Sequence, residues 1–232
     1  MSSVRTMAPV TKGIAPEPEI LRKRVDRYYR ERVEETWDGG HIMVGRQPGP
    51  DAVRLCSNDY LCMARHPDVI AAQRESLEDE DAMLMAAVFL HGDNPQAQFE
   101  SAMAEWMGSE AAILSQSGWA ANTGLIQAIA EPGTPCYVDM FAHMSLWEGV
   151  TSAAGQPVAF RHNSPEHLER MIARHGPGIV IVDSVYSTSG SVAPLADIVA
   201  VAEAAGCVII VDEAHSLGTH GPQGRGRSST PI

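Results

Sequence analysis

Residues 208–218 read Val208-Ile209-Ile210-Val211-Asp212-Glu213-Ala214-His215-Ser216-Leu217-Gly218, and this stretch decides the fold. A short run that is apolar on both faces is typical of a buried strand in a parallel sheet. Here the run ends in an acid, and a histidine follows three residues later. Ligands of open parallel sheets bind beyond the carboxyl ends of the strands. Asp212 and His215 therefore stand where we expect a bound ligand.

Upstream of this stretch, compact apolar runs alternate with segments of helical spacing. Strands are expected at residues 111–115, 135–139, 157–160, 178–183 and 207–211. Helices are expected at residues 119–130, 145–154, 165–175 and 195–206. Strands apolar on both faces and separated by helices predict an α/β fold, in which a mostly parallel sheet is covered on both sides in three αβα layers.

The N-terminal part of the chain is expected to be helical and outside the sheet. Helical spacing predicts helices at residues 18–37, 67–81 and 95–107, with a short apolar segment at 83–92. The apolar side of the first helix is expected to pack against another element or another subunit. We expect a disordered leader over residues 1–16, a helical segment and linker over 17–92, an incomplete large domain over 93–226 and an aberrant tail over 227–232.

Composition limits the classes of partner. The 232-residue chain is 44% hydrophobic and carries a formal net charge of -12, so neither a nucleic acid nor a membrane surface is an expected partner. The four cysteines show no close-paired metal spacing, which fits a reducing cytoplasm. No signal peptide and no apolar run of membrane-spanning length are evident. We therefore expect a cytoplasmic globular protein.

Polar residues at several strand ends could together bind a flat, phosphorylated cofactor. Asp212 could pair with a protonated ring nitrogen, or serve as a helix cap or in an internal ion pair. His215 could donate to a cofactor oxygen, or be a core histidine with its hydrogen bonds satisfied. The sequence Ser117-Gly118-Trp119 begins a helix, whose backbone N–H groups could hold a phosphate, although Ser-Gly is also common in structural turns.

Three further residues join this set by their position. Asn122 lies in the first turn of the same helix as Gly118. His143 lies between a strand and a helix, where its ring could stack on a cofactor or simply cap the helix. Ser187 could add a hydroxyl group near the ring or the phosphate, but serine is ordinary in such turns. Only the joint order of these residues on successive strand ends favours the cofactor interpretation.

The chain resembles the α-oxoamine synthases, which are fold-type-I pyridoxal-phosphate (PLP) enzymes. The resemblance spans about residues 19–226 and is closest to the branch that makes long-chain aminoketone quorum-sensing autoinducers. It is carried by the motifs Leu114-Ser115-Gln116-Ser117-Gly118-Trp119, Phe141-Ala142-His143-Met144-Ser145-Leu146-Trp147-Glu148-Gly149, Arg174-His175-Gly176-Pro177-Gly178 and Ser216-Leu217-Gly218-Thr219-His220-Gly221-Pro222. The resemblance implies a PLP-dependent transferase fold and the condensation of an amino acid with an acyl-CoA thioester.

Residue roles follow from the same resemblance. His143 matches the histidine that stacks on the cofactor ring, and Asp212 matches the partner of the pyridinium nitrogen. His215 matches the donor to the phenolate oxygen, which makes His143 and His215 the expected catalytic residues. Gly118 with Trp119 matches the phosphate-binding pair, and Ser117 and Asn122 adjoin it. Ser187 matches a hydroxyl group close to the cofactor.

The chain departs from the family pattern in two places. Where ordinary members carry a Gly-Ser-Arg type segment, this chain reads Ala86-Ala87-Val88-Phe89-Leu90-His91-Gly92, which suits an apolar acyl chain or a different amino donor such as S-adenosylmethionine. The only lysines are Lys12 and Lys23, so the lysine that relatives use as Schiff base and general base is absent. We expect a chain truncated before the last strands and the C-terminal domain, and inactive alone.

Two alternatives come from other functional classes. The chain could be a non-catalytic PLP-binding or regulatory fragment that pairs with a full-length subunit, because relatives are homodimers. It could instead be a metal hydrolase that uses Asp212, His215 and His220, although such a site would need further converging ligands and an open coordination position.

Overall fold

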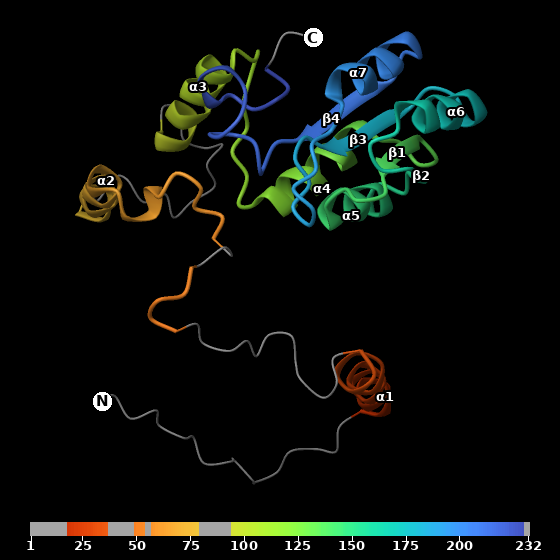
Figure 1. Ribbon diagram of the computed structural model, residues 1–232, viewed down its shortest axis with the longest axis horizontal. Coiled ribbons are helices and arrows are strands. Elements are labelled where there is room, and N and C mark those ends of the chain that lie inside the picture. Colours follow the sequence, from red (N-terminus) through yellow and green to blue (C-terminus); the bar gives the residue numbers. More distant parts are fainter. Residues whose placement is uncertain (1–17, 37–48, 54–56, 79–93, 230–232) are drawn as a thin grey trace. The chain divides into compact units, whose positions relative to one another are not determined.

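The computed structural model in Figure 1 describes residues 18–36, 49–53, 57–78 and 94–229. The chain separates into two units, Met1–Leu55 and Cys56–Ile232. The expected leader, the apolar segment at 83–92 and the last three residues of the tail lie outside the described residues. The domain limits expected from the sequence remain predictions.

The helices and strands alternate along the second unit. Its helices are η2 (Met63–Arg65), α2 (Pro67–Glu78), α3 (Pro95–Met107), α4 (Gly118–Ile129), α5 (Met144–Ser152), α6 (Pro165–His175), α7 (Leu195–Ala204) and η4 (Pro222–Gly224). Its strands are β1 (Pro135–Asp139), β2 (Gln156–Phe160), β3 (Ile179–Asp183) and β4 (Val208–Asp212). The first unit contributes α1 (Glu19–Tyr28) and a π-helix, η1 (Tyr29–Glu34).

The four strands form one parallel sheet in the order β2-β1-β3-β4. Register places the last residues of neighbouring strands opposite each other: Asp139 faces Phe160, and Asp183 faces Asp212. In Figure 1, α4 and α5 lie on one side of the sheet, and α6 and α7 lie on the other. This arrangement confirms the predicted three-layer α/β fold with a parallel sheet.

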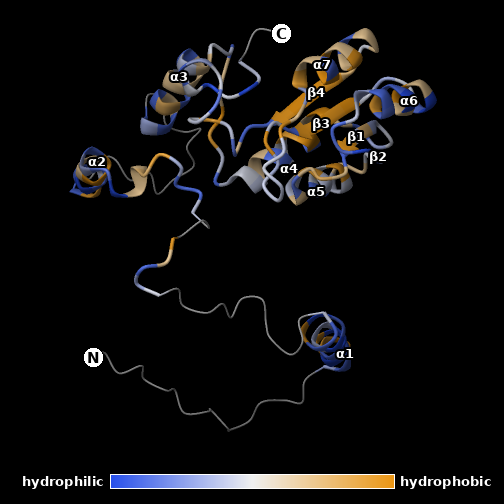
Figure 2. Ribbon diagram, viewed as in Figure 1, coloured by the Kyte–Doolittle hydropathy of each residue, from blue (hydrophilic) through white to orange (hydrophobic). Residues whose placement is uncertain are grey.

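Alternation along β3 distributes side chains to the two sides of the sheet. Val180 and Val182 pack with residues of α6 and α7, whereas Ile179 and Ile181 pack with residues of α4 and α5. All five residues of β3 are buried, as expected for a central strand covered on both faces. The strands accordingly form the hydrophobic centre of this unit in Figure 2. Burial of this apolar surface is the main force that stabilises the layers.

Most of the expected elements are confirmed to within one or two residues at each end. Helix α6 has the predicted limits, and its N-cap Ser164 accepts a hydrogen bond from the His167 N–H at 3.3 Å. The strand expected at residues 111–115 was wrong. Ile113 is 88% exposed, and the Leu114 N–H donates to the Glu100 carboxylate at 2.7 Å. Residues 111–115 have no partner strand among the described residues, and the Glu100 side chain binds the backbone of this run instead.

The predicted first helix changes its hydrogen-bonding pattern part way along. It is α-helical to Tyr28 and then continues as the π-helix to Glu34, where Val33 is buried. On the face expected to pack against another element or another subunit, Ile20 is 82% exposed and Val33 is buried. No helix among the described residues has both the length and the apolar character needed to cross a membrane.

The close approach of Gly178 to β1 gives a test of this sheet. A Cβ atom at Gly178 would lie 2.0 Å from the Pro135 carbonyl oxygen, and this backbone cannot give way cheaply. We expect Gly178→Ala to lower the free energy of unfolding by roughly 1–3 kcal/mol, measured by urea denaturation.

Gly124→Ala is the matched control, because a Cβ atom at this position in α4 meets nothing within 4 Å. We expect it to be neutral or to stabilise the protein by about 0.4–1 kcal/mol. Equal stability of the two variants would contradict the packing of β1 against the start of β3.

Candidate functional site

Three aspartates end three neighbouring strands and define one edge of the sheet. Asp139 ends β1, Asp183 ends β3 and Asp212 ends β4. Asp139 and Asp183 are buried, and Asp212 is partly buried. Because buried carboxylates need hydrogen bonds or opposite charge, the polar groups around them determine what this edge can bind.

A cleft of about 150 Å³ opens at this edge between the N-terminus of α4 and the end of β4. It is lined by Gly118, Trp119, Asn122, His143, Ser145, Asp183, Asp212, Ala214 and His215. Six of these residues belong to the set expected from the sequence. The structure therefore brings together residues from the ends of three strands, β1, β3 and β4, and from the N-terminus of α4.

A chain of hydrogen bonds joins the acid of the cleft to its imidazole. The Asn122 amide donates one hydrogen to Asp212 Oδ2 at 2.7 Å and the other to Ser145 Oγ at 2.9 Å. Ser145 Oγ lies 2.7 Å from His143 Nδ1, which also accepts the Ser145 N–H at 3.3 Å. Because Nδ1 accepts, the neutral His143 ring carries its proton on Nε2. Asn122 thus orients both Asp212 and His143.

The N-terminus of α4 leaves two donors free at the cleft. Ser117 is the N-cap, and its hydroxyl accepts the Ala120 N–H at 3.1 Å. The N–H groups of Gly118 and Trp119 contact no acceptor among the described residues, as expected for the first turn of a helix. Together with the helix dipole they form an anion-binding end. The Ser117 side chain itself caps the helix and does not line the cleft.

Asp183 lies under the cleft and has an unusual pKa. Its side chain accepts the His143 N–H at 3.2 Å. Burial is the main cause that raises the pKa of Asp183 from 3.8 to about 7; the hydrogen bond from the His143 N–H opposes the rise, and the nearby charges of Asp212 and Asp139 add to it. The acid under the cleft is therefore partly protonated near neutral pH.

His215 and Ser187 meet in a second cavity that shares His215 with the cleft. This cavity is lined by Tyr60, Val185, Tyr186, Ser187, Gly190, His215, Thr219 and His220. Tyr60 Oη lies 2.6 Å from His215 Nδ1. His215 thus belongs to both spaces, whereas the exposed Ser187 lines only the second.

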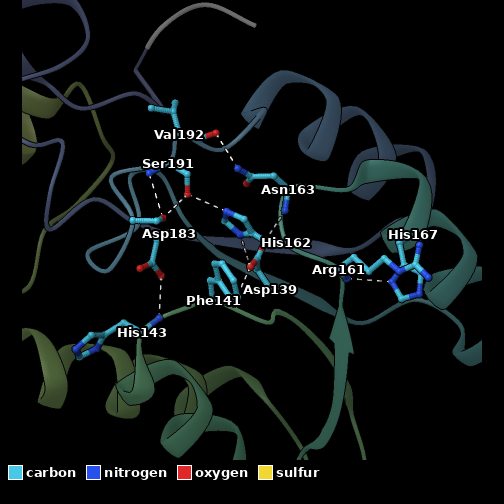
Figure 3. Close-up of polar contacts among 11 residues, drawn as sticks. Asp139, Phe141, His143, Arg161, His162, Asn163, His167, Asp183, Ser191 and Val192 are labelled. Atoms are coloured by element: carbon cyan, nitrogen blue, oxygen red, sulfur yellow. Dashed lines mark hydrogen bonds and ion pairs between the residues drawn. The ribbon is translucent and has the colours of Figure 1, made fainter.

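A second polar cluster surrounds Asp139, shown in Figure 3. His162 Nδ1 lies 2.9 Å from Asp139 Oδ1, and His162 Nε2 lies 2.8 Å from Ser191 Oγ. This order is the order of a serine–histidine–aspartate triad, but Ser191 Oγ also lies 2.7 Å from Ser189 Oγ. The His162 ring is stacked on Phe141 at 4.4 Å between ring centroids. The cluster fastens the loop between β3 and α7, which carries Ser187, to the ends of β1 and β2.

The cleft fits the groups of PLP expected from the resemblance. The free N–H groups of Gly118 and Trp119 suit a phosphate, and a Cβ-sized group at Gly118 would meet nothing within 4 Å, so the backbone can be approached. The Asp212 carboxylate keeps acceptor capacity beyond the bonds from Asn122 and the Ala214 N–H, and suits a pyridinium N–H. His143 supplies a flat ring, in edge contact with Trp119.

Sequence reasoning did not assign Ser145, Asp183 or Tyr60 to the site. Asp183 could have been found, because it ends an apolar run as Asp212 does. Tyr60 gave no such signal, since it is 155 positions from its partner His215. Among the described residues no three histidine, cysteine or acidic side chains form a metal-binding group, so Asp212, His215 and His220 do not converge as a hydrolase would need.

Known proteins are similar to this chain in sequence and in fold. Residues 50–229 match the family "Aminotransferase class I and II". The chain is 45% identical over 219 residues to the CAI-1 autoinducer synthase of Vibrio campbellii, covering 94% of this chain and 55% of that protein. It is 36% identical over 182 residues to the serine palmitoyltransferase of Sphingomonas paucimobilis, covering 77% of this chain and 43% of that protein.

Solved structures of serine palmitoyltransferases are also similar to this chain. The serine palmitoyltransferase of Sphingomonas wittichii has a TM-score of 0.70 and 34% identity, covering 75% of this chain and 44% of that one. The S. paucimobilis enzyme, solved with PLP and myriocin bound, has a TM-score of 0.69 and 36% identity, covering 73% of this chain and 44% of that one. The chain spans about half the length of the curated relatives that it matches.

The raised pKa of Asp183 predicts a pH-dependent stability. Because its pKa is about 7 in the folded protein and near 3.8 in the unfolded chain, the folded state binds the proton more tightly between these values. The contribution of Asp183 to the free energy of unfolding is fully present below about pH 4. It falls by about 4 kcal/mol in total as pH rises to about 7.

Asp183→Asn removes this titration, while Asn can still accept the His143 N–H. We expect the variant to gain stability relative to the parent as pH rises from about 4 to 7, measured by urea denaturation at each pH. Carboxylates distant from Asp183 titrate alike in both proteins, so the difference reports Asp183 together with its coupling to Asp212 and Asp139. Parallel stability curves would show that the pKa of Asp183 is ordinary.

Proposed function

The chain belongs to the aminotransferase class I and II family, and from this premise we propose that it holds PLP as the cofactor-binding part of an α-oxoamine synthase. Such an enzyme is an acyltransferase that condenses an amino acid with an acyl-CoA thioester and releases CoA. One observation carries the proposal: Asn122 joins Asp212 to Ser145, which in turn orients His143, directly beside the free N-terminus of α4.

Six residues of the cleft, and Ser187 from the adjoining cavity, have proposed roles at the cofactor. The Gly118 and Trp119 N–H groups would hold the phosphate, and Asn122 lies one turn along the same helix. The Asp212 carboxylate would pair with the ring nitrogen and keep it protonated. His143 would lie against the ring, and His215 would donate to the phenolate oxygen. Ser187 would offer a hydroxyl group from the second cavity, which shares His215 with the cleft.

The cofactor supplies, when bound, an electron sink for a carbanion next to the amino group of the substrate. The protein's part is to orient this sink and to keep its ring nitrogen charged. Asp212 does this through a carboxylate whose position is fixed by the Ala214 N–H at 2.9 Å and by Asn122. His143, whose Nδ1 accepts the Ser145 N–H, would present the face of its ring to the cofactor.

We propose the autoinducer branch for the substrates. Its support is the 45% identity to the CAI-1 autoinducer synthase of Vibrio campbellii, which exceeds the 36% identity to serine palmitoyltransferase. The product would be the precursor of an aminoketone autoinducer, with acyl-CoA as one substrate and an amino acid or S-adenosylmethionine as the other. The working unit would be a homodimer in the cytoplasm.

The chain supplies no lysine to this cleft. Lys12 and Lys23 are the only lysines in the sequence, and the residues that line the cleft include neither. We propose that the chain alone binds the cofactor but does not turn over, because the covalent anchor and base are missing. The same observation supports the second candidate, a non-catalytic PLP-binding or regulatory fragment that pairs with a full-length subunit.

Loss of the Asp212 charge tests the cofactor proposal. Asp212→Asn keeps the size of the side chain but removes the charged partner of the ring nitrogen. We expect it to weaken PLP binding by about 10- to 100-fold, measured by quenching of tryptophan fluorescence on titration. Asp197→Asn, at an exposed acid in the first turn of α7, is the control and should leave affinity unchanged. Equal affinity of parent and Asp212→Asn would refute this site.

Turnover tests the role of the missing lysine. With PLP, a series of acyl-CoA thioesters of increasing chain length and an amino acid or S-adenosylmethionine, we expect the chain to release no CoA above the blank, measured with a thiol reagent. CoA release by the purified chain would show that another group supplies the base.

Sequencing the coding DNA and the region downstream separates the two candidates: a lysine-containing remainder supports the synthase, and unrelated DNA supports the fragment.

A further inference from the structure

The hydroxyl of Tyr60 contacts the one ring nitrogen of His215 that decides which tautomer the ring adopts. Tyr60 Oη lies 2.6 Å from His215 Nδ1. This separation is short for an N–H donor to oxygen, for which 2.9–3.0 Å is usual, and lies within the range of O–H donors. Donation by the phenol to a bare Nδ1 fits this separation better than donation by an Nδ1–H group. The proton of the neutral ring then lies on Nε2.

Tyr60 stands on a turn that is fixed by its own hydrogen bonds. The Asp59 carboxylate accepts the N–H groups of Met63 at 2.7 Å and Ala64 at 3.2 Å, and the Asp59 carbonyl accepts the Cys62 N–H at 3.1 Å. The next residue, Leu61, reaches the segment that carries His215: its Cδ1 would lie 3.4 Å from a Cβ atom at Gly218. Two consecutive side chains of this turn thus meet the same segment.

The segment that carries His215 is held by Glu213. The Glu213 carbonyl accepts the N–H groups of Ser216 at 3.0 Å and Leu217 at 2.9 Å. The Glu213 carboxylate accepts the Ser184 hydroxyl at 2.8 Å and the Ser228 N–H at 2.7 Å. Tyr60 and His215 thus lie on segments that are each held by hydrogen bonds, so the fold determines the contact between the phenol and the imidazole.

We propose that Tyr60 is a positioning residue that holds His215 in the tautomer with hydrogen on Nε2, so that the ring presents an N–H donor to the cleft. The proposal rests on the proposed function, because the acceptor would be the phenolate oxygen of PLP. In the other tautomer Nε2 would be a lone-pair acceptor and would repel that oxygen. No acceptor for Nε2 occurs among the described residues, so this donor is available to a ligand.

The tautomer can be measured directly in the 232-residue chain without cofactor. Histidine is labelled with ¹⁵N, and long-range ¹H–¹⁵N spectra are recorded at a pH where the rings are neutral; His215→Gln assigns the signal. We expect a bare Nδ1 and a protonated Nε2 in the parent. Tyr60→Phe should shift the tautomer ratio toward Nδ1–H by about two- to tenfold, the effect of one lost hydrogen bond.

Tyr29→Phe is the matched control, since it removes an exposed phenol hydroxyl from η1 and should leave the His215 signal unchanged. Leu61→Ala loosens the packing of the turn without removing the Tyr60 hydroxyl and should keep the tautomer. A protonated Nδ1 in the parent overturns the proposal even if Tyr60→Phe fails to fold. An unchanged ratio in a folded Tyr60→Phe protein also overturns it.

Cofactor affinity separates this inference from the proposed function. If the parent shows the Nε2–H tautomer and binds PLP, Tyr60→Phe should bind PLP several-fold more weakly. PLP binding with the wrong tautomer in the parent overturns the role of Tyr60 and leaves the proposed function standing. The right tautomer without PLP binding sinks the proposed function, and with it the role of Nε2 as a donor to the cofactor.

Discussion

Parallel pairing in register brings Asp139, Asp183 and Asp212 to one edge of the sheet, and the surrounding structure must accommodate their carboxylates. The three carboxylates differ in their hydrogen-bond partners. Asp139 is satisfied by the N–H groups of Phe141 and Asn163 and by His162. Asp212 is held by Asn122 and a backbone N–H. Asp183 accepts the His143 N–H, but this bond does not offset its burial, which raises the pKa of the carboxyl group.

This division of roles explains how one edge can serve both stability and binding. The cluster around Asp139 is closed on itself and fastens a loop, so its acid is not available to a ligand. The acid of Asp212 is bound on both oxygens yet retains lone pairs toward the cleft. A cofactor with a cationic ring nitrogen would complete its compensation. The cleft is thus polarised, with an acid at β4 and a helix N-terminus at α4.

Local pattern was enough to predict the layers of this fold. Strands β1 to β4 are short apolar runs bounded by turns. The start of α6 is predicted by a serine cap and a first-turn proline. The run at residues 111–115 has the same composition, yet it is no strand, because strand formation needs a partner that composition cannot supply. The edge position of each acid was also visible, because parallel strands place their carboxyl ends together.

The contacts within the site could not be predicted in the same way. That Asn122 bridges Asp212 and Ser145 depends on how α4 packs against α5, which no spacing along the chain reveals. Tyr60 belongs to a turn that the sequence does not connect to His215, and its role follows only from the folded chain. Residues that touch the expected ligand were therefore easier to find than the residues that orient them.

A crystal structure of the chain in complex with PLP tests the central claim most directly. The account predicts the phosphate at the N–H groups of Gly118 and Trp119, the ring nitrogen beside the Asp212 carboxylate and the ring against His143. Cofactor bound elsewhere on the chain, or bound at this cleft with the phosphate away from α4, would contradict it.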